Sequence, residues 1–497
     1  MERGSGILMP VSSLPSPYGI GTLGKSAEAY IDFLARAGQS WWQILPVGPT
    51  SVGDSPYQSP SAYAGNPYFI DLDLLIEDGL LTKEEVQGIH WGDDPTCTDY
   101  GLLYRERIPL LSKAAERGRK RDRDKALAFA EENASWLADY TMFMALKRHF
   151  GMREWTEWPD EDLRMHRAEA LAVWRDKLDE DIWLFTYLQY LFFKQWNDLR
   201  KYARSKNIKI LGDIALYVAL DSADVWSSPE NFLLDEEHRP MEVAGVPPDL
   251  FSDDGQLWGN PLYDYAHMQR DGFGWWVQRI GGAAKLYDAI RIDQFRGIES
   301  YWAGPASETT AKNGRWVKGP GMDLIGTLKA HFPDIQFIAE DLGYPTREVE
   351  QLLDDSGFPG MKLLVFAFDR RNTGGRMPHS YKTNSICYTG THDNETLNGW
   401  IAHADPRDLA KARVYLGLNE EEGYARGFFR GGMSSVSCLF IAQMQDYLEL
   451  GDEARMNTPG TMSGNWRWRM LPGQDLDGLA DKIREMTILY GRNQDHG

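Results

Sequence analysis

Three acidic residues, each placed after a short apolar run, are the residues of this chain that could do chemistry. Asp293 follows AIRI, Glu340 follows IQFIA, and Asp393 follows SICYTGTH. Each run is typical of a short buried strand. A retaining glycosidase or transglycosidase needs two such carboxylates, one as nucleophile and one as acid/base, on opposite sides of an anomeric carbon. The pattern therefore predicts carboxylate chemistry at the ends of strands.

Arg291 lies two residues before Asp293, and both side chains point to the same side of a strand because strand side chains alternate. We expect the guanidinium to keep Asp293 ionised by lowering its pKa. The alternative interpretation of this two-residue spacing is that Arg291 and Asp293 form a buried ion pair with a structural role only. Three strands that each deliver a carboxylate to one rim favour the catalytic interpretation.

The spacing of these carboxylates indicates a parallel barrel. They are separated by 47 residues (340 minus 293) and by 53 residues (393 minus 340). Such intervals fit one or two βα units of a barrel whose catalytic groups come from different strands. The fold expected is a (β/α)8 TIM barrel of class α/β. Its eight strands are predicted at 6–11, 41–47, 208–218, 289–292, 335–341, 360–369, 385–393 and 439–445.

The chain has 497 residues, which exceeds the roughly 250 of a bare barrel. We expect one catalytic domain over 1–497, with large and mainly helical insertions between barrel strands and no separate C-terminal β-sandwich. One insertion, 80–207, follows the second strand and is mainly helical. The other, 219–261, follows the third strand and bears a lid at 246–258, stiffened by prolines. Ser26 is the predicted N-cap of the first helix, and 119–125 is predicted to be a solvated helix face.

Composition limits the classes of partner that this chain is expected to bind. The net charge of −20 argues against nucleic acid and anionic membranes and fits a neutral ligand. The 18 Trp and 23 Tyr residues are explained by a large aromatic core, by sugar-stacking surfaces, or by both. Three scattered cysteines predict neither a disulfide framework nor a metal site and favour a reducing cytoplasm. The first 17 residues do not fit a signal peptide, and no run is long and apolar enough to cross a bilayer.

The sequence resembles the 4-α-glucanotransferases of the amylomaltase, or disproportionating enzyme, family over most of its length. The resemblance rests on these motifs: GILMPVSSLPSPYGIGTLG, SPYQSPSAYAGNP, GDIALYVALDSADVW, VAGVPPDLFSDDGQLWGNP, IRIDQFRG, IAEDLG, GMKLLVFAFD, YTGTHDNET and MNTPGTMSGNWRWR. The helical region of about 80–180 is the least similar to the family. The residue after the nucleophile is commonly His in this family and is Gln294 here, and the HDND segment of the family ends in Glu395.

The resemblance implies roles for individual residues. Asp293 would be the nucleophile, Glu340 the acid/base, and Asp393 the carboxylate that binds sugar hydroxyls and favours ring distortion. Substrate-binding roles are implied for a further set: Arg291, His392, Asp213, Tyr57, Ser55, Trp258, Asp249, Phe251 and Asn465. No metal and no organic cofactor is expected. The expected partners are α-1,4-glucans as donors and glucose or a glucan as acceptor.

Two other functions remain open from the sequence. An α-glucan hydrolase of the same clan uses the same three carboxylates, so only the products from maltotriose would distinguish it. A non-catalytic starch-binding protein would be expected to have lost one of these carboxylates, and all three are present.

Overall fold

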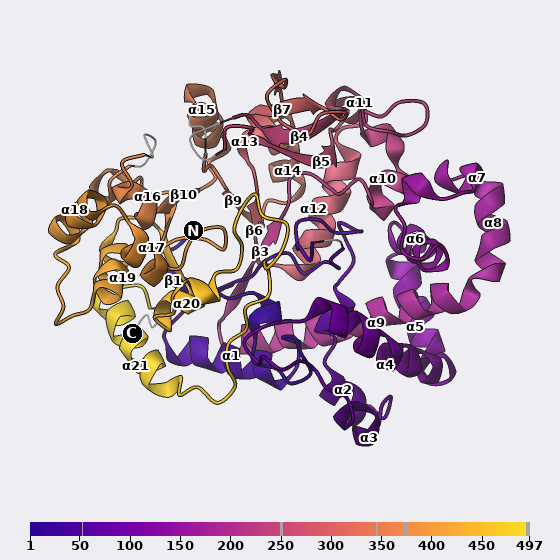
Figure 1. Ribbon diagram of the computed structural model, residues 1–497, viewed down its shortest axis with the longest axis horizontal. Coiled ribbons are helices and arrows are strands. Elements are labelled where there is room, and N and C mark those ends of the chain that lie inside the picture. The colour runs from indigo at the N-terminus through magenta and orange to yellow at the C-terminus, as the bar shows by residue number, and fades with distance from the viewer. Residues whose placement is uncertain (52, 249–251, 344–345, 372–375, 494–497) are drawn as a thin grey trace.

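The computed structural model describes residues 1–51, 53–248, 252–343, 346–371 and 376–493, and its centre is a closed barrel of parallel strands (Figure 1). The barrel confirms the predicted (β/α)8 fold. Each strand pairs with the next barrel strand along the chain, and the last pairs with the first. The barrel strands are β1 (Gly4–Leu8), β2 (Trp41–Gln43), β3 (Lys209–Ile214), β6 (Ala289–Ile292), β9 (Gln336–Ala339), β10 (Gly360–Leu363), β11 (Ser385–Tyr388) and β12 (Leu439–Gln443).

Most residues of these strands are buried on both faces, as a sheet covered by helices requires. All residues of β1, β6, β11 and β12 are buried. Close packing also dictates Gly212 in β3, since a Cβ there would lie 2.1 Å from the ring of Tyr287. The strand ends are therefore fixed by tight neighbours, which matters for the side chains that follow them.

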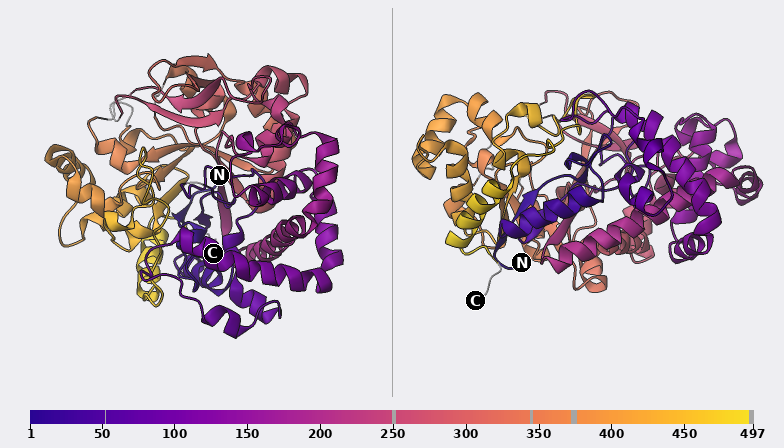
Figure 2. Two further views of the ribbon diagram at one scale, coloured as in Figure 1. Left: turned by 45° about the vertical axis from the view of Figure 1, so that its right-hand side comes forward. Right: turned by 90° about the horizontal axis from the view of Figure 1, so that it is seen from below.

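Helices surround the barrel in every view (Figures 1 and 2). The first, α1 (Lys25–Arg36), has Gly24 as its N-cap, so the predicted N-cap at Ser26 is wrong by two positions. The helices that follow later strands are α12 (Gly274–Leu286), α14 (Met322–His331), α15 (Arg347–Ser356), α17 (Leu397–His403), α18 (Pro406–Leu416), α19 (Tyr424–Ser434) and α21 (Asp477–Leu489).

Between β2 and β3 the chain forms a large group of helices, seen as the purple part at the right and lower right of Figure 1 and again in Figure 2. One of these helices, α3 (Lys83–Gln87), begins with a capping box formed by Thr82 and Glu85. The helices are α2 (Leu72–Glu77), α3 (Lys83–Gln87), α4 (Tyr100–Arg121), α5 (Arg123–Glu132), α6 (Leu137–His149), α7 (Glu161–Arg164), α8 (Ala168–Lys177) and α9 (Asp179–Ser205). That 80–207 forms a subdomain of its own stays a prediction.

Residues 119–125 are not one solvated helix face, because α4 ends and α5 begins within them. Asp122 stands at the junction and is buried. Its carboxylate accepts a hydrogen bond from Tyr187 of α9 at 2.8 Å and pairs with Arg121. The alternating charges therefore include a buried acceptor that ties the junction to α9.

An antiparallel sheet next to the barrel was not foreseen. It contains β4 (Glu242–Val246), β5 (Gln256–Pro261), β7 (Ser300–Pro305) and β8 (Arg315–Lys318), in the order β5-β4-β7-β8. The sheet lies at the top of Figure 1, and it joins the insertion after β3 to the segment after β6. Whether residues 246–258 act as a lid stays a prediction, and residues 249–251 lie outside the described part of the chain.

The predicted strand 360–369 is half helix: β10 ends at Leu363 and α16 (Leu364–Phe368) follows at once. The other short helices are α10 (Ala223–Ser227), α11 (Tyr265–Arg270), α13 (Arg296–Glu299) and α20 (Met444–Tyr447). From β12 to residue 493, the described chain adds helices but no further named strand. Among the described helices, none combines the length and the apolar character that a membrane span needs.

Candidate active site

Two of the three predicted carboxylates leave adjacent strands at the same rim. The backbone N–H of Asp293, just after β6, donates to Ile214 O of β3 at 2.9 Å. The N–H of Glu340, just after β9, donates to Ile292 O of β6 at 3.1 Å. These ladder bonds continue the barrel by one residue, so both side chains stand at the carboxyl ends of their strands, as expected.

Arg291 connects two carboxylates. Its Nη1 atom donates to both oxygens of Asp213 at 2.8 and 2.7 Å, and it lies 3.0 Å from Asp293 Oδ1. Arg291 and Asp213 are almost fully buried, whereas 29% of the Asp293 side chain is accessible to solvent. Asp213, at the end of β3, therefore neutralises part of the charge of the guanidinium that faces Asp293.

The expected lowering of the Asp293 pKa by Arg291 is wrong in its net direction. Enclosure by protein atoms raises the pKa of Asp293 well above its usual range, and nearby Glu340 adds to this, while Arg291 acts in the opposite direction. The physical reason for the error is desolvation, which a sequence pattern does not reveal.

Glu340 is buried, and this burial raises its pKa to about 7. Arg291 and two backbone N–H groups oppose the shift: Gln294 N donates to Oε2 and Leu342 N donates to Oε1, each at 2.8 Å. Two neighbouring desolvated carboxylates with raised pKa values share protons as a pair. One protonated and one ionised carboxyl group is the state that an acid/base and a nucleophile require.

Gln294, where the family commonly has His, adopts the left-handed backbone conformation with φ of +56°. This conformation is uncommon for residues other than glycine. It directs the Gln294 N–H toward the Glu340 carboxyl group. The backbone of Gln294 thus contributes to the site whatever its side chain does.

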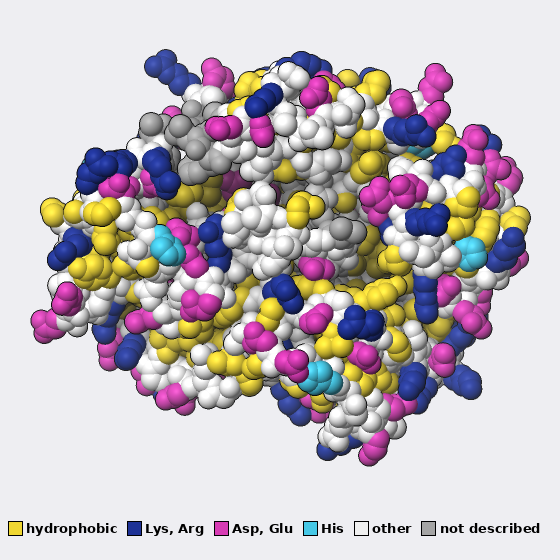
Figure 3. Space-filling view, viewed as in Figure 1, with side chains coloured by type: hydrophobic (Ala, Val, Ile, Leu, Met, Phe, Trp, Pro, Cys, Tyr) yellow, Lys and Arg dark blue, Asp and Glu magenta, His cyan; other side chains and the backbone are white. Residues whose placement is uncertain are grey.

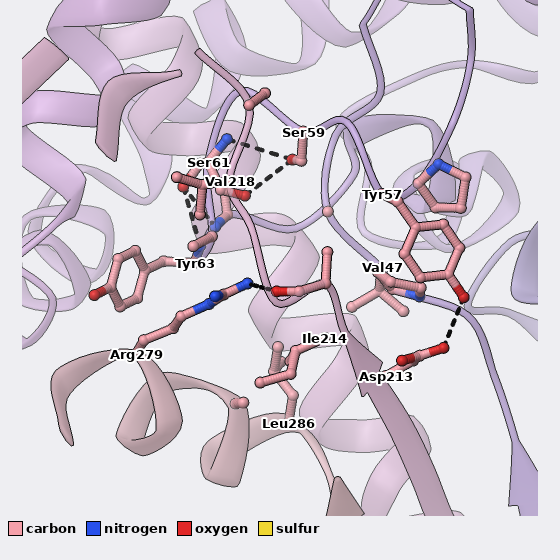
Figure 4. Close-up of a pocket in the computed structure, with 18 of the residues that line it drawn as sticks. Val47, Tyr57, Ser59, Ser61, Tyr63, Asp213, Ile214, Val218, Arg279 and Leu286 are labelled. Atoms are coloured by element: carbon pink, nitrogen blue, oxygen red, sulfur yellow. Dashed lines mark hydrogen bonds between the residues drawn. The ribbon is translucent and has the colours of Figure 1, made fainter. Parts of the chain in front are cut away.

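Tyr57 closes the site from the loop after β2. Its hydroxyl donates to Asp213 Oδ2 at 2.7 Å, as Figure 4 shows, and lies 3.0 Å from His392 Nε2. The Tyr57 and His392 rings stack with centroids 5.3 Å apart, and Trp466 packs against both. A cavity of about 60 Å³ adjoins Tyr57 and Asp213 on the side of Arg279 (Figure 4).

His392 is neutral at neutral pH because burial lowers its pKa. Since the Tyr57 hydroxyl proton is given to Asp213, His392 Nε2 must carry the proton that bonds to the Tyr57 oxygen. The same Nε2 lies 3.5 Å from Asp393 Oδ2. A hydrogen-bonded chain therefore runs from His392 through Tyr57 and Asp213 to Arg291.

Asp393 is held by the polar segment that follows β12. Asn457 Nδ2 donates to Asp393 Oδ1 at 2.7 Å, and Arg455 Nη2 donates to Asp393 O at 2.8 Å. The N–H of Asn457 also donates to His392 O at 3.0 Å. Asp393 remains partly exposed, with 43% of its side chain accessible, so its second oxygen is open to a ligand.

Ser55, Asn465 and Trp258, for which binding roles were also expected, lie on three different segments of the chain. Ser55 Oγ accepts the N–H of Tyr57 at 3.2 Å and so shapes the turn that presents Tyr57. Asn465 bonds to Thr458 and Thr461 and so closes a loop after β12. Trp258 lies on β5 with its ring centroid 6.2 Å from that of Tyr217. Asp249 and Phe251 lie outside the described residues.

Asn457, Arg455 and Trp466 reach the site although no role was predicted for them. Asn457 and Trp466 belong to the polar and aromatic motif MNTPGTMSGNWRWR, which also contains Asn465, and Arg455 directly precedes this motif. Asp341, next to Glu340, points elsewhere: it accepts from Met361 N and pairs with Lys362 at 2.9 Å. Asp341 therefore fastens β9 to β10.

The structure offers one group that could ligate a metal among its described residues: Glu395, His403 and Asp452, with ligand atoms within 4.8 Å of one another. His403 Nδ1 lies 2.8 Å from Glu395 and 3.3 Å from Asp452. Hydrogen bonds to both carboxylates raise the pKa of His403, so a protonated imidazole accounts for the group. On the face in Figure 3, acidic and basic side chains are interspersed.

Comparisons with known proteins agree with this geometry. The family profile described as 4-alpha-glucanotransferase, glycoside hydrolase family 77, matches residues 9–474. A 4-alpha-glucanotransferase of Clostridium butyricum is 48% identical over 97% of this chain and 100% of its own. The enzyme of Thermus thermophilus is 46% identical over 98% of both chains.

Solved structures extend the similarity to the whole fold. An amylomaltase from Streptococcus agalactiae in complex with acarbose superposes with a TM-score of 0.96 at 43% identity, over 99% of this chain and 100% of that one. These relatives favour a transferase over a hydrolase. The chain belongs to the 4-alpha-glucanotransferases of glycoside hydrolase family 77.

Proposed function

We propose that this 4-alpha-glucanotransferase transfers a segment of an α-1,4-glucan to the 4-hydroxyl of an acceptor glucose or glucan by a retaining double displacement. The donor is a maltooligosaccharide, starch or glycogen chain. The observation that carries the proposal is the pair of desolvated carboxylates at the rim, Asp293 beside Arg291 and Glu340 with a pKa of about 7. The acarbose bound to the similar amylomaltase supports an α-glucan as ligand.

In the first step, Asp293 attacks the anomeric carbon while Glu340 donates its proton to the glycosidic oxygen. The bond from the anomeric carbon to that oxygen breaks, the reducing-end fragment leaves with the proton, and a β-linked glycosyl-enzyme remains on Asp293. Arg291 favours the ionised form of Asp293 before the attack. Burial favours the protonated form of Glu340 at the same moment.

In the second step, the 4-hydroxyl of an acceptor attacks the same carbon from the opposite face. Glu340, now a carboxylate, takes the hydroxyl proton, and Asp293 leaves as a carboxylate. Two inversions restore the α-configuration. No step requires a metal or an organic cofactor.

The remaining residues bind and orient the reacting glucose in this proposal. Asp393 accepts hydrogen bonds from sugar hydroxyls and favours ring distortion. Neutral His392 offers its ring next to Asp393, and Tyr57 fixes that ring through the hydrogen bond to Nε2. Trp258, Asp249 and Phe251 shape the acceptor side, and Ser55, Asp213 and Asn465 complete the binding set. We also propose a cytoplasmic location, which the three free cysteines support.

The product distribution from maltotriose tests the reaction. A transferase forms longer maltooligosaccharides together with glucose, whereas a hydrolase only shortens the substrate. Chromatography of the products at early times gives the ratio of transfer to hydrolysis. Maltose and glucose alone, without maltopentaose, would contradict the proposal.

A further inference from the structure

Asp446 is a buried carboxylate near the site that the mechanism above does not use. It lies in α20, directly after β12, and 1% of the residue is exposed. No salt bridge to Asp446 occurs among the described residues, and burial raises its pKa to about 6. An unpaired buried carboxylate is costly, so its hydrogen bonds indicate what it does.

Besides a backbone hydrogen bond with Gln443, at the start of its own helix, Asp446 makes two hydrogen bonds to the segment that carries His392 and Asp393. Thr389 Oγ1 donates to Asp446 Oδ2 at 2.6 Å, and Leu397 N donates to Asp446 Oδ1 at 2.7 Å. Thr389 follows β11 directly, and Leu397 is the first residue of α17. One carboxylate therefore joins the two ends of the 389–397 segment.

The middle of the 389–397 segment has its own bonds. Asn394 Oδ1 accepts from Thr391 N at 2.8 Å, and Asp393 N donates to Thr391 Oγ1 at 3.3 Å, which close a local turn. Asn457 and Arg455 then bond to Asp393 from outside. Local bonds define the shape of the turn, and contacts from outside the segment, among them those of Asp446, Asn457 and Tyr57, set its position over the rim.

We propose that Asp446 is a positioning residue that places His392 and Asp393 against the reacting glucose by clamping the ends of the 389–397 segment. The inference rests on the proposed function, because Asp446 acts only through residues that this function assigns to sugar binding. A displacement of about 1 Å in a site built on fitted geometry can lower turnover by about 100-fold.

The test uses Asp446→Asn, which keeps the shape of the side chain but presents an NH2 group to one of the two donors. We expect kcat for maltotriose disproportionation to fall about 10- to 100-fold, with the folded fraction unchanged by circular dichroism. Asp288→Asn is the matched control, since Asp288 is a partly buried carboxylate that also joins two barrel strands, but at their amino ends. We expect kcat of that control to stay within about twofold of wild type.

A double-mutant cycle separates positioning from a structural role. α-Maltotriosyl fluoride as donor keeps slow variants measurable, because fluoride leaves without a proton. If Asp446 acts through the 389–397 segment, Asp446→Asn should lower the rate in the wild-type background and change it by less than about twofold in Asp393→Asn. Equal factors in both backgrounds, or an unchanged kcat in folded Asp446→Asn, would overturn the inference.

Thr389 provides a second route if Asp446→Asn does not fold. Thr389→Val removes one donor and keeps the charge, and we expect it to lower kcat in the same background-dependent way, with Thr389→Ser restoring it. Loss of folding by Asp446→Asn together with full activity of Thr389→Val would contradict the inference. The single variant Asp393→Asn tests the proposed function separately: unchanged turnover there would overturn the role of Asp393 and the inference with it.

Discussion

The two ends of the barrel treat carboxylates in opposite ways. At the amino ends of the strands, Asp288 accepts from Arg200 at 2.9 Å, from Arg204 at 3.0 Å and from Ile210 N at 2.9 Å. Burial opposes its ionisation, but these hydrogen bonds lower its pKa overall. Asp288 directly precedes β6 and Asp293 directly follows it; Asp293 has a single arginine contact, and desolvation raises its pKa.

The difference separates stability from function at the two ends of one strand. Charge compensation at the amino end stabilises a carboxylate in one protonation state. Glu340 and Asp446 at the other end lack an ion pair among the described residues, and their pKa values are raised to about 7 and about 6. A group such as Glu340, which titrates near neutral pH, suits proton transfer.

The largest effect is expected for Asp293, the proposed nucleophile. Asp293→Asn removes the covalent route, so kcat for maltotriose should fall by on the order of 10⁴-fold. Asp288→Asn, at the other end of the same strand, should keep kcat within about twofold of wild type. Initial rates from glucose release, corrected for the folded fraction, measure both. A common loss in the two variants would remove the functional distinction between the two ends.

The second-largest effect is expected in the dependence of kcat/KM on pH. Glu340 must be protonated for the first step, and its raised pKa places the loss of that proton near pH 7. We expect kcat/KM to fall about tenfold per pH unit on the alkaline side of that pKa. Site-specific NMR of Glu340 should show its pKa falling in Asp293→Asn, because a neighbouring negative charge is lost. A pKa of Glu340 that stays in place would count against the coupled pair.

Because proton binding is linked to folding, Glu340 and Asp288 contribute to the free energy of unfolding with opposite signs. Because the folded pKa of Glu340 is raised, its unfavourable contribution is absent below its unfolded pKa of about 4.5 and grows as pH rises to about 7. Because the folded pKa of Asp288 is lowered, its favourable contribution is present above the unfolded value and is lost as pH falls through the folded one.

These signs can be measured by urea unfolding between pH 4 and 8. Glu340→Gln should weaken the decrease of the unfolding free energy with pH in that range. Asp288→Asn should lower the unfolding free energy by about 1 to 3 kcal/mol at pH 7, since Arg200 and Arg204 lose their partner. The same pH slope in wild type and Glu340→Gln would show that the rim carries no such cost.

The sequence predicted the rim better than what surrounds it. Asp293 and Glu340 each follow an apolar run directly, and that local signal gives both the strand and the position of the side chain. The antiparallel sheet was missed because β4 pairs with β7 across more than fifty residues, and glycines and prolines interrupt its alternation. Asp446 and Asn457 were missed because hydrogen bonds to the segment after β11 leave no periodic pattern.

The smallest effect is expected at Trp258, on the antiparallel sheet beyond the rim. Water competes with the acceptor for the glycosyl-enzyme, so a transferase must give the sugar hydroxyl an advantage by proximity and orientation. An aromatic face that stacks on an acceptor glucose would supply part of that advantage. Trp258 packs near Tyr217 and is partly exposed, which leaves ring area for a sugar.

Trp258→Ala should therefore raise the ratio of hydrolysis to transfer with maltotriose about three- to tenfold, the loss expected for one stacking contact of about 1 kcal/mol. Trp174→Ala is the matched control, because Trp174 is also partly buried but lies on α8 among the helices between β2 and β3. We expect its product ratio to match wild type, and both variants to keep their melting temperatures within a few degrees. An unchanged ratio in Trp258→Ala at equal folded fraction would place the acceptor contact elsewhere, and the antiparallel sheet would then belong with the stabilising parts of the molecule.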